Sequence, residues 1–527
     1  MKRLFTLAFC LCACVILAFA ATDPNPTMKI GLFFDSSALP SANLQNAVGA
    51  GYRLGQFDEN RVFTPLFTIN DQKISMLKDV NFYYADGTFY ESGAPSGSKR
   101  IGAYNLQLQT TYATATEASS MADSLKLRGN IAFPAYQNGG FVVRVGSYAD
   151  FAAATAAGQS ANLGQATLVA GAEPQTVTVT DTTTGDILFE YGGNLGVLPV
   201  GTNTKTWFKG YQYYGSFQYI RSGGNLTVVN VVKMQDYIKG VIPYEMSASW
   251  PLEALRAQAM CARTYAMSSR RHKDFDLCNT TDCQVYRGTN SASETTDRAV
   301  DSTLGMYILY EGKPISAVYH SSDGGATENS ENVWTGVTPY LRGVKDPYED
   351  LDAATHGRWS YEYTGEEIAA LLRAKGKTPG KIVDVRTTYT EMGNMLCMTF
   401  VDENGEEYSY SKEPARTFFA KDAQKRYVYS LRFTITKKGS AGTGAVVPST
   451  GGTLFVNGPS VSIQLSDDTA IIGAGGTRTL SNGDSVTVRS ANGTRNYSVG
   501  GTTTTPNVPS TSGDVVFLIN GTGWGHK

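Results

Sequence analysis

The chain has 527 residues, a length that suits about three domains. Apolar residues make up 42% of it, as in ordinary globular proteins, and a formal net charge of −2 excludes a strong overall field for nucleic acid or anionic lipid. Charged residues are only 17%, and glycine and tyrosine are abundant, so the composition favours an extracellular, strand-rich protein over a helical cytosolic enzyme.

The N-terminus carries a targeting signal. Lys2 and Arg3 precede an apolar run over residues 4–20, and the small residues Ala18 and Ala20 fit a cleavage site near Ala21. We therefore expect a secretory signal peptide over residues 1–20 and a secreted, extracytoplasmic protein. The alternative is an uncleaved membrane anchor, because the run barely reaches the length that spans a bilayer.

Strand-like segments dominate the part of the chain that follows the predicted signal peptide. Residues 28–100 are predicted as an N-terminal β segment, which begins with a strand near Ile30. The periodicity of apolar residues changes over residues 101–172 and predicts a compact, inserted βαβ-type unit of two strand–helix halves. Its predicted strands cover residues 104–108 and 141–145, and its predicted helices cover residues 118–125 and 149–157.

The main domain is predicted over residues 176–438. It is β-rich at first, and its one long helix, over residues 251–271, has an apolar face and Pro251 in its first turn. Mixed strands and a shorter helix over residues 366–374 complete it. The predicted fold class is therefore α+β and strand-rich.

The C-terminal part differs in composition. Residues 439–513 are rich in glycine, threonine and serine and predict a linker around a small β insertion. A last strand over residues 515–519 leads into a Gly-Trp-Gly-His segment close to Lys527. We treat residues 514–527 as one short C-terminal segment.

Glu245 stands out as a candidate acid. A strand-like run ends at Pro243, the carboxylate follows, and the long helix begins within two turns. A carboxylate just ahead of a helix N-terminus feels the positive end of the helix dipole, while apolar neighbours would raise its pKa. Such a group can protonate a leaving group. A solvated loop glutamate is the alternative, and this local pattern by itself favours that alternative.

Cysteines offer a second candidate site. Cys278 and Cys283 are separated by four residues, and His272 lies six residues before the first of them. Two thiolates and an imidazole in a short loop can bind Zn²⁺, usually with a fourth ligand from elsewhere. A local disulfide is the alternative outside the cell. Either role would be structural.

Three long segments resemble the signatures of the SpoIID/LytB family. The first covers residues 241–246 (VIPYEM), 249–259 (SWPLEALRAQA) and 262–266 (ARTYA); the second covers 319–328 (YHSSDGGATE) and 333–334 (VW); the third is 523–526 (GWGH). The resemblance extends over about residues 180–438 and the extreme C-terminus, and the strand near Ile30 is expected to join the same domain. Some SpoIID-like proteins also carry a metal in the corresponding cysteine-containing loop.

This resemblance implies a lytic transglycosylase that acts on peptidoglycan during sporulation or cell-wall remodelling. By analogy, Glu245 protonates the glycosidic oxygen between MurNAc and GlcNAc and then, as a carboxylate, assists attack by the MurNAc 6-hydroxyl. The product is a 1,6-anhydroMurNAc end, so one acid/base suffices where hydrolytic glycosidases usually use two carboxylates. The family prefers strands without stem peptides, which implies a partner amidase.

Further motif residues are expected to bind substrate, each with a structural alternative. Arg263 could instead form a structural ion pair, Trp334 could be a buried core residue, and the second motif could be a turn of small residues. The expected substrate-binding residues are Gln258, Arg263, Tyr319, Ser321, Ser322, Glu328, Trp334 and His526.

The unit at residues 101–172 resembles a SPOR domain, through its two strand–helix halves and the segment 141–148 (FVVRVGSY). SPOR modules bind glycan strands that lack stem peptides, which agrees with the substrate implied above. Fold alone does not establish function.

One departure from the family pattern concerns the third motif, which normally continues beyond the glycine–histidine pair, whereas this chain ends at Lys527. A truncated motif favours a second hypothesis, a non-catalytic cell-wall-binding scaffold or amidase enhancer, while the presence of Glu245 favours catalysis. A metal-dependent amidase or protease is disfavoured, since the chain has four histidines and no H-E-x-x-H motif.

Overall fold

The computed structural model divides the chain into two compact units, Met1–Val318 and Tyr319–Lys527. This boundary falls inside the region predicted as the main domain. The predicted signal peptide and His526 lie outside the described residues. Those residues are 23–160, 163, 167–171, 173–221, 224–334, 336–352, 357–419, 426–438, 470–473, 476–479, 485–490, 493–498 and 515–523. Among them, no helix is both long enough and apolar enough to cross a membrane.

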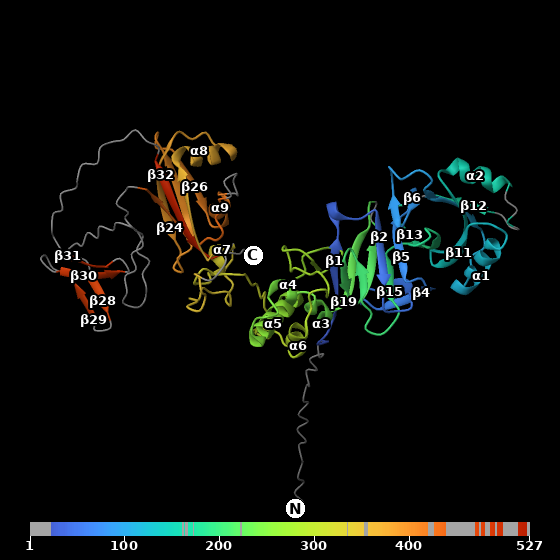
Figure 1. Ribbon diagram of the computed structural model, residues 1–527, viewed down its shortest axis with the longest axis horizontal. Helices are drawn as coiled ribbons and strands as arrows, with labels where there is room; N and C mark the ends of the chain where they lie inside the picture. The colour runs from blue at the N-terminus through green and yellow to red at the C-terminus, as the bar shows by residue number, and fades with distance from the viewer. Residues whose placement is uncertain are drawn as a thin grey trace, which may run out of the picture. The chain divides into compact units, whose positions relative to one another are not determined.

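A seven-stranded sheet forms one part of the first unit (Figure 1). Its strands, in spatial order, are β20 (Leu277–Cys278), β1 (Thr27–Phe33), β19 (Thr227–Lys233), β18 (Ser216–Ile220), β15 (Leu195–Pro199), β3 (Tyr52–Phe57) and β4 (Phe63–Ile69). β1 runs antiparallel to β19, with Met28 opposite Val232. The predicted strand near Ile30 therefore joins the strand that leads into the Glu245 segment.

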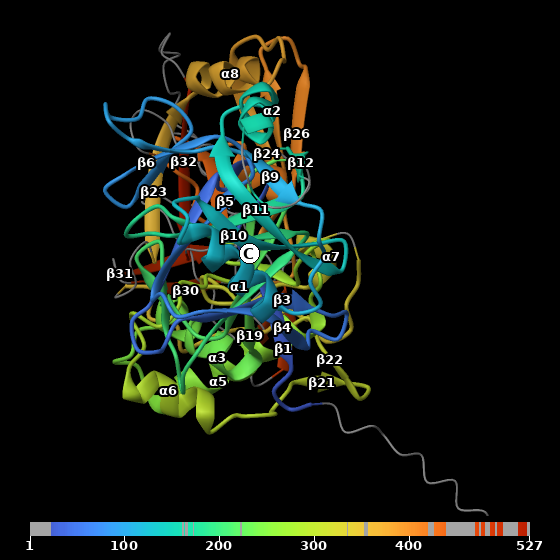
Figure 2. The same cartoon turned by 90° about the vertical axis from the view of Figure 1, so that its right-hand side faces the viewer.

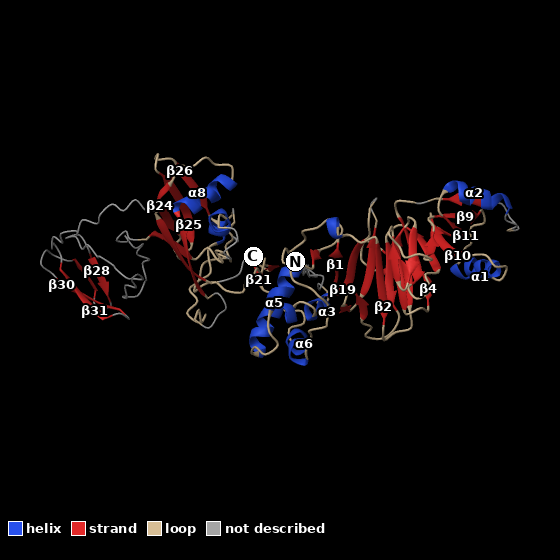
Figure 3. Ribbon diagram, turned by 45° about the horizontal axis from the view of Figure 1, so that its top comes forward, coloured by secondary structure: helices blue, strands red, loops and turns tan. Residues whose placement is uncertain are grey.

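The second large sheet of this unit has ten strands, of which β2, β10, β11 and β9 are labelled in Figure 3. In spatial order they are β12 (Thr167–Ala170), β9 (Tyr104–Leu108), β11 (Gly140–Tyr148), β10 (Ala132–Gln137), β14 (Ile187–Gly192), β13 (Thr176–Asp181), β5 (Lys73–Lys78), β2 (Ser41–Asn46), β16 (Thr206–Phe208) and β17 (Tyr211–Tyr213). A smaller sheet contains β7 (Thr88–Tyr90), β6 (Phe82–Ala85) and β8 (Lys99–Ile101).

The unit predicted at residues 101–172 is a βαββαβ module in the order β9-α1-β10-β11-α2-β12 (Figure 2). Helix α1 (Ala115–Lys126) packs against β10 and β11, and α2 (Phe151–Ser160) packs against β9, β11 and β12. A reciprocal capping box between Thr114 and Glu117 begins α1. The two strand–helix halves are confirmed, and β10 and β12 are added to them. Such an arrangement is a split βαβ fold.

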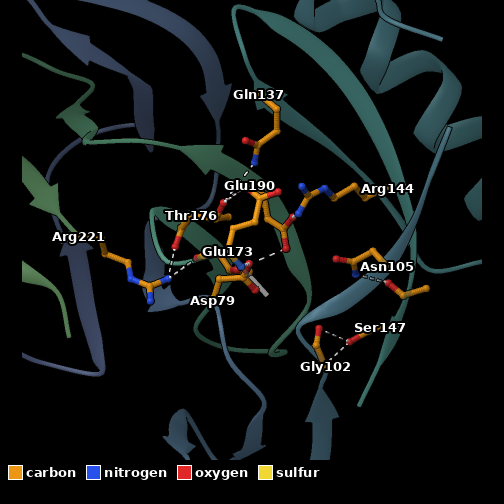
Figure 4. Close-up of polar contacts among 12 residues, drawn as sticks. Asp79, Gly102, Asn105, Gln137, Arg144, Ser147, Glu173, Thr176, Glu190 and Arg221 are labelled. Atoms are coloured by element: carbon orange, nitrogen blue, oxygen red, sulfur yellow. Dashed lines mark hydrogen bonds and ion pairs between the residues drawn. The ribbon is translucent and has the colours of Figure 1, made fainter. Parts of the chain in front are cut away.

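The module is not a separate body on a linker. Its strand β10 runs parallel to β14, with Ala135 opposite Glu190, so its four strands continue the ten-stranded sheet. Behind this junction, Arg144 of β11 forms an ion pair with Glu190, and both side chains are 1% exposed (Figure 4). Burial raises the pKa of the adjacent Asp79, and the charge of Glu190 raises it further. Removing one partner would leave a buried charge unpaired, so these contacts fix the module against the sheet.

Helices follow β19 in the first unit. They are α3 (Met234–Lys239), α4 (Ile242–Glu245), α5 (Leu252–Ser268) and α6 (Glu294–Asp301), followed by the short hairpin of β21 (Leu309–Tyr310) and β22 (Lys313–Pro314). The long helix predicted over residues 251–271 is α5, and its buried face includes Leu255, Ala259 and Ala262. Pro251 caps this helix rather than occupying its first turn, since its ψ of 139° is not helical.

The second unit contains two three-stranded sheets. One has the order β23 (Arg358–Thr364), β32 (Val516–Thr522), β27 (Phe433–Lys437), and the other has the order β24 (Ile382–Tyr389), β25 (Met395–Asp402), β26 (Glu407–Ser411). The helices are α7 (Ser330–Val333), α8 (Gly365–Ala374) and α9 (Glu413–Thr417). The C-terminal strand β32 is central in its sheet, and its Phe517 and Ile519 are fully buried in the core of this unit.

The glycine-rich segment 439–513 separates β27 from β32 in sequence. Within it the structure describes two hairpins, β28 (Ala470–Gly473) with β29 (Gly476–Thr479), and β30 (Ser485–Ser490) with β31 (Gly493–Ser498). Both hairpins lie within the segment predicted as a linker around a small β insertion.

Candidate functional site

Glu245 is the last residue of the short helix α4, and its side chain is half-buried. Its Oε1 accepts a hydrogen bond of 3.1 Å from the backbone N–H of Val285. Among the described residues, no donor reaches its Oε2. A helix begins within two turns of Glu245, as expected, because α5 starts at Leu252. The short helix α4 was not expected, and Glu245 is its last residue, so the carboxylate does not lie at a helix N-terminus.

The loop that supplies this N–H is held by the buried side chains on either side of Val285. Gln284 accepts from the Tyr237 hydroxyl at 2.9 Å and donates to the Ala262 carbonyl at 3.2 Å. The Tyr286 hydroxyl donates to Asn230 at 2.8 Å. Sequence reasoning missed Val285 because every residue except proline offers a backbone N–H, so its role leaves no trace in the side-chain pattern.

Helix α5 carries two of the predicted substrate-binding residues, Gln258 and Arg263, and their hydrogen bonding differs. Arg263 is fully buried, and its guanidinium donates to Gln235 Oε1 at 2.9 Å, Thr303 Oγ1 at 3.2 Å and the Val300 carbonyl at 3.3 Å. This environment favours a structural role for Arg263 over contact with a sugar, although its partners are neutral rather than the ion pair considered from the sequence.

Gln258 lies one turn and a half before Arg263 on the same helix. Its side-chain Nε2 is buried and, within the described part of the chain, has no hydrogen-bond acceptor. A buried donor without an acceptor costs free energy, so it requires an explanation, of which a substrate oxygen is one.

The predicted metal ligands lie together in the first unit. One donor atom from each of His272, Cys278, Asp282 and Cys283 lies within 4.8 Å of the others, and the Cys283 Sγ is 3.4 Å from His272 Nε2. Both cysteines are free thiols. A hydrogen bond from Cys283 lowers the pKa of the Cys278 thiol to about 5, which favours the thiolate form that a metal needs.

These distances suit a tetrahedral ion. Zinc–sulfur and zinc–nitrogen bonds of about 2.3 and 2.1 Å separate the two ligand atoms by about 3.6 Å, close to the observed separation between Cys283 and His272. The Asp282 carboxylate is slightly farther, with Oδ2 4.0 Å from both the Cys283 Sγ and the His272 Nε2. The residues present therefore fit zinc, with Asp282 as the fourth donor that the sequence left unassigned.

The second and third motifs belong to the second unit, where they meet. Thr522 donates from its hydroxyl to the Gly324 carbonyl at 3.1 Å, and a Cβ at Gly523 would lie 2.7 Å from the Gly324 Cα. Gly324 itself has a φ of 71°, which favours glycine. The start of the third motif thus packs directly on the second motif, although two hundred residues separate them. Trp524 and His526 lie outside the described residues.

Glu328 ends the first segment of the second motif, residues 319–328, and already has several hydrogen-bond donors. They are the Asn329 N–H at 2.7 Å, Asn332 Nδ2 at 3.0 Å, Asn394 Nδ2 at 3.1 Å and the Thr390 hydroxyl. These bonds connect the motif to the turn between β24 and β25. They favour a structural role for Glu328 over the predicted contact with substrate.

The remaining predicted residues of this motif differ in exposure. Ser321 is exposed and Tyr319 half-buried. Trp334 follows α7 and is 42% exposed, so it is not the buried core residue considered as its alternative. An exposed indole within the motif is suited to stacking on a pyranose ring.

Asp323 of the same motif and Glu349 form an acidic pair beside Ser322. Burial and a hydrogen bond with Glu349 raise the pKa of Asp323 to about 6. Burial would also raise the pKa of Glu349, but the Ser322 hydroxyl, Asp323 and the Gly324 N–H lower it overall. The two carboxyls therefore affect each other's ionisation, and the half-buried Arg432 guanidinium adds a positive charge nearby.

Comparisons with known proteins agree with the first motif. A family model described as SpoIID, stage II sporulation protein, matches residues 222–310. An uncharacterized protein of Brachyspira hyodysenteriae is 43% identical over 139 residues, which are 26% of this chain and 38% of that protein. An amidase enhancer of Bacillus subtilis is 41% identical over 160 residues, 30% of this chain and 22% of the enhancer.

A third relative is the stage II sporulation protein D of Bacillus subtilis, which is 35% identical over 144 residues, 24% of this chain and 41% of the relative. The chain thus spans less than half the length of each of these proteins. The matched region includes Glu245, Gln258, Arg263 and the cysteine-containing loop. Residues 222–310 of this chain therefore match the SpoIID family.

Proposed function

We propose that this chain is a lytic transglycosylase of peptidoglycan, in which Glu245 is the acid/base. The observation that carries the proposal is the state of this carboxylate: one oxygen is fixed by the Val285 N–H, and no donor among the described residues reaches the other. A fixed and partly exposed carboxyl can present its free oxygen to a substrate. The names of the relatives, which include a stage II sporulation protein D, support a role at the cell wall.

The proposed reaction uses Glu245 twice. In the first half, the protonated carboxyl donates its proton to the oxygen between MurNAc and GlcNAc as the C–O bond to the MurNAc anomeric carbon breaks. In the second half, the carboxylate accepts the proton of the MurNAc 6-hydroxyl as that oxygen bonds to the anomeric carbon. A 1,6-anhydroMurNAc end forms, Glu245 regains its proton, and no water is consumed.

The test is digestion of amidase-treated glycan strands, followed by mass spectrometry. We expect anhydroMurNAc ends from the wild type, and a loss of about 10²–10⁴-fold in rate for Glu245→Gln, the range typical of a general acid. Glu253→Gln is the matched control, because Glu253 is an exposed glutamate on α5 whose ion pair within the described part of the chain is with Arg256. Hydrolytic ends would exclude a transglycosylase, and unchanged rates for Glu245→Gln would exclude this residue.

A second candidate function is stimulation of a cell-wall amidase without catalysis. It is favoured by the 41% identity to the Bacillus subtilis amidase enhancer. The two functions separate in one assay, in which Glu245→Gln is added to a cell-wall amidase with peptidoglycan. Full stimulation by this variant together with no anhydroMurNAc from the wild type would favour the enhancer.

The βαββαβ module is proposed to bind glycan strands, as the SPOR domains that it resembles do. Its strand and helix order supports this proposal, and its fixed place in the ten-stranded sheet would hold a bound strand in one orientation within the first unit. Photoreactive glycan strands without stem peptides, mixed with Glu245→Gln, should crosslink within residues 101–172. Crosslinks confined to other residues would contradict this role.

Zinc is proposed to bind His272, Cys278, Asp282 and Cys283. In this position it would act as a structural crosslink of the loop that ends two residues before Val285, the donor to Glu245. We expect about one zinc per chain by metal analysis and little in Cys278→Ser, whereas Cys397→Ser, in which a cysteine outside the cluster is replaced, should keep it. Equal metal content in all three proteins would exclude the site.

A further inference from the structure

Lys412 lies between β26 and α9 and has an uncommon backbone conformation. Its φ is 56° and its ψ is −137°, a region that glycine adopts freely and that strains a residue with a Cβ. The backbone there is well determined by its neighbours, because the Lys412 N–H donates to the Leu396 carbonyl at 2.9 Å and its carbonyl accepts from Ala415 at 2.8 Å. Glycine would occupy this position at less cost in free energy.

The side chain offers a reason for lysine at this position. Its Nζ donates to the backbone carbonyls of Glu331 at 2.5 Å and of Trp334 at 3.2 Å. These carbonyls belong to the C-terminal end of helix α7, where intrahelical donors are lacking and a cation is favourable. A residue some eighty positions later in the chain thus completes the turn that presents Trp334.

Other contacts hold the same turn but leave the Trp334 carbonyl to Lys412. The Trp334 N–H donates to the Ser330 carbonyl at 2.7 Å, and the Ser330 hydroxyl contacts both the Gly336 carbonyl and the Thr338 N–H. The guanidinium of Arg342 donates to both carboxylate oxygens of Glu331. Trp334 nevertheless remains 42% exposed, so these contacts hold the turn without covering the residue.

We propose that Lys412 is a positioning residue, whose ammonium group holds Trp334 as a stacking platform for a sugar ring of the glycan strand. This inference rests on the proposed function, since it takes the glycan as the ligand of Trp334. The strained backbone places the Lys412 side chain under α7, and the two hydrogen bonds keep the indole in one orientation before the sugar arrives. Pre-organisation of this kind reduces the entropy that binding must spend.

The test uses glycan strands freed of stem peptides as the probe, and Glu245→Gln as the background so that the strands are not cleaved. In that background, Trp334→Ala should weaken binding on the order of tenfold, the scale of one aromatic stacking contact. Lys412→Gly and Lys412→Ala should each weaken it by a smaller factor, and Lys412→Arg should recover part of the loss. Adding Lys412→Gly to Trp334→Ala should weaken binding no further.

Stability distinguishes positioning from ordinary support of the fold. Lys412→Gly relieves the backbone strain, so it should melt at a higher temperature than Lys412→Ala although both bind glycan equally poorly. Hydrogen exchange should show faster exchange at the Trp334 amide in both variants without any ligand present.

The outcomes separate the two proposals. Weaker binding by Trp334→Ala but not by Lys412→Gly would overturn the positioning role and leave the platform in place. Wild-type binding by Trp334→Ala would overturn the platform and, with it, the functional role of Lys412. Unchanged exchange at Trp334 in Lys412→Gly would show that the ammonium does not hold the turn.

Discussion

Glu245 and Glu328 are both signature-motif glutamates, but their hydrogen bonding differs sharply. Among the described residues, the Glu245 carboxylate accepts one hydrogen bond, from the Val285 N–H. The Glu328 carboxylate accepts four, which come from Asn329, Asn332, Thr390 and Asn394. A carboxylate with donors on both oxygens cannot take up a proton without losing partners, whereas one with an open oxygen can exchange a proton with a substrate. Unused hydrogen-bonding capacity therefore separates a candidate catalytic group from a structural one.

The largest effect expected from this contrast is on stability. Glu328→Ala removes a charged acceptor from four donors, and it should lower the free energy of unfolding of the second unit by about 2–4 kcal/mol. Glu245→Ala should lower that of the first unit by no more than about 1 kcal/mol, because one backbone N–H of the described residues loses its acceptor. Urea unfolding, with each unit followed by hydrogen exchange of its own amides, measures both values. Equal losses would remove the distinction between the two glutamates.

A smaller effect, of opposite sign, is expected on helix α5. Gln258→Met removes a buried donor that has no acceptor among the described residues, so it should raise the free energy of unfolding by up to about 1 kcal/mol. If Gln258 binds substrate, the same variant should cleave glycan strands more slowly despite its greater stability. Arg263→Met is the control on the same helix, and it should destabilise because Gln235 loses its donor. A stabilised Gln258→Met with full activity would remove Gln258 from the site.

Local periodicity predicted the elements of the fold well. The apolar face of α5, the helix α8 and the strand β9 were placed within a few residues, since burying one side of a helix or strand imposes a repeat that sequence shows directly. Pairing between distant strands was not predictable in this way. Neither the attachment of β10 to β14 nor the central place of β32 between β23 and β27 has a local signal.

The same limit applies to the candidate site. The clustering of His272 with Cys278 and Cys283 followed from their short spacing, and the structure added Asp282. The burial of Arg263 and the exposure of Trp334 remained open in the sequence, because each depends on which distant segments cover the side chain. Lys412 gave no signal at all, since its significance lies in a backbone angle and in two carbonyl groups.

The smallest effect on the free energy of unfolding is expected from a substitution of Asp323. Its pKa is raised to about 6 by burial and by Glu349, above the usual value of about 3.9, so the folded state binds its proton more tightly than the unfolded state. Its contribution to stability is therefore full below about pH 4 and is lost as the pH rises through 6.

Asp323→Asn cannot ionise, and its amide can still accept from Gly325 and donate to Glu349. It should therefore be more stable than the wild type above pH 6, with the difference vanishing toward pH 4. Because Asp323 is partly exposed, solvent screening should keep this gain below about 1 kcal/mol. Melting temperatures of both proteins between pH 4 and pH 8 test the sign, and a gain that grows toward low pH would show that Asp323 and Glu349 do not compete for a proton.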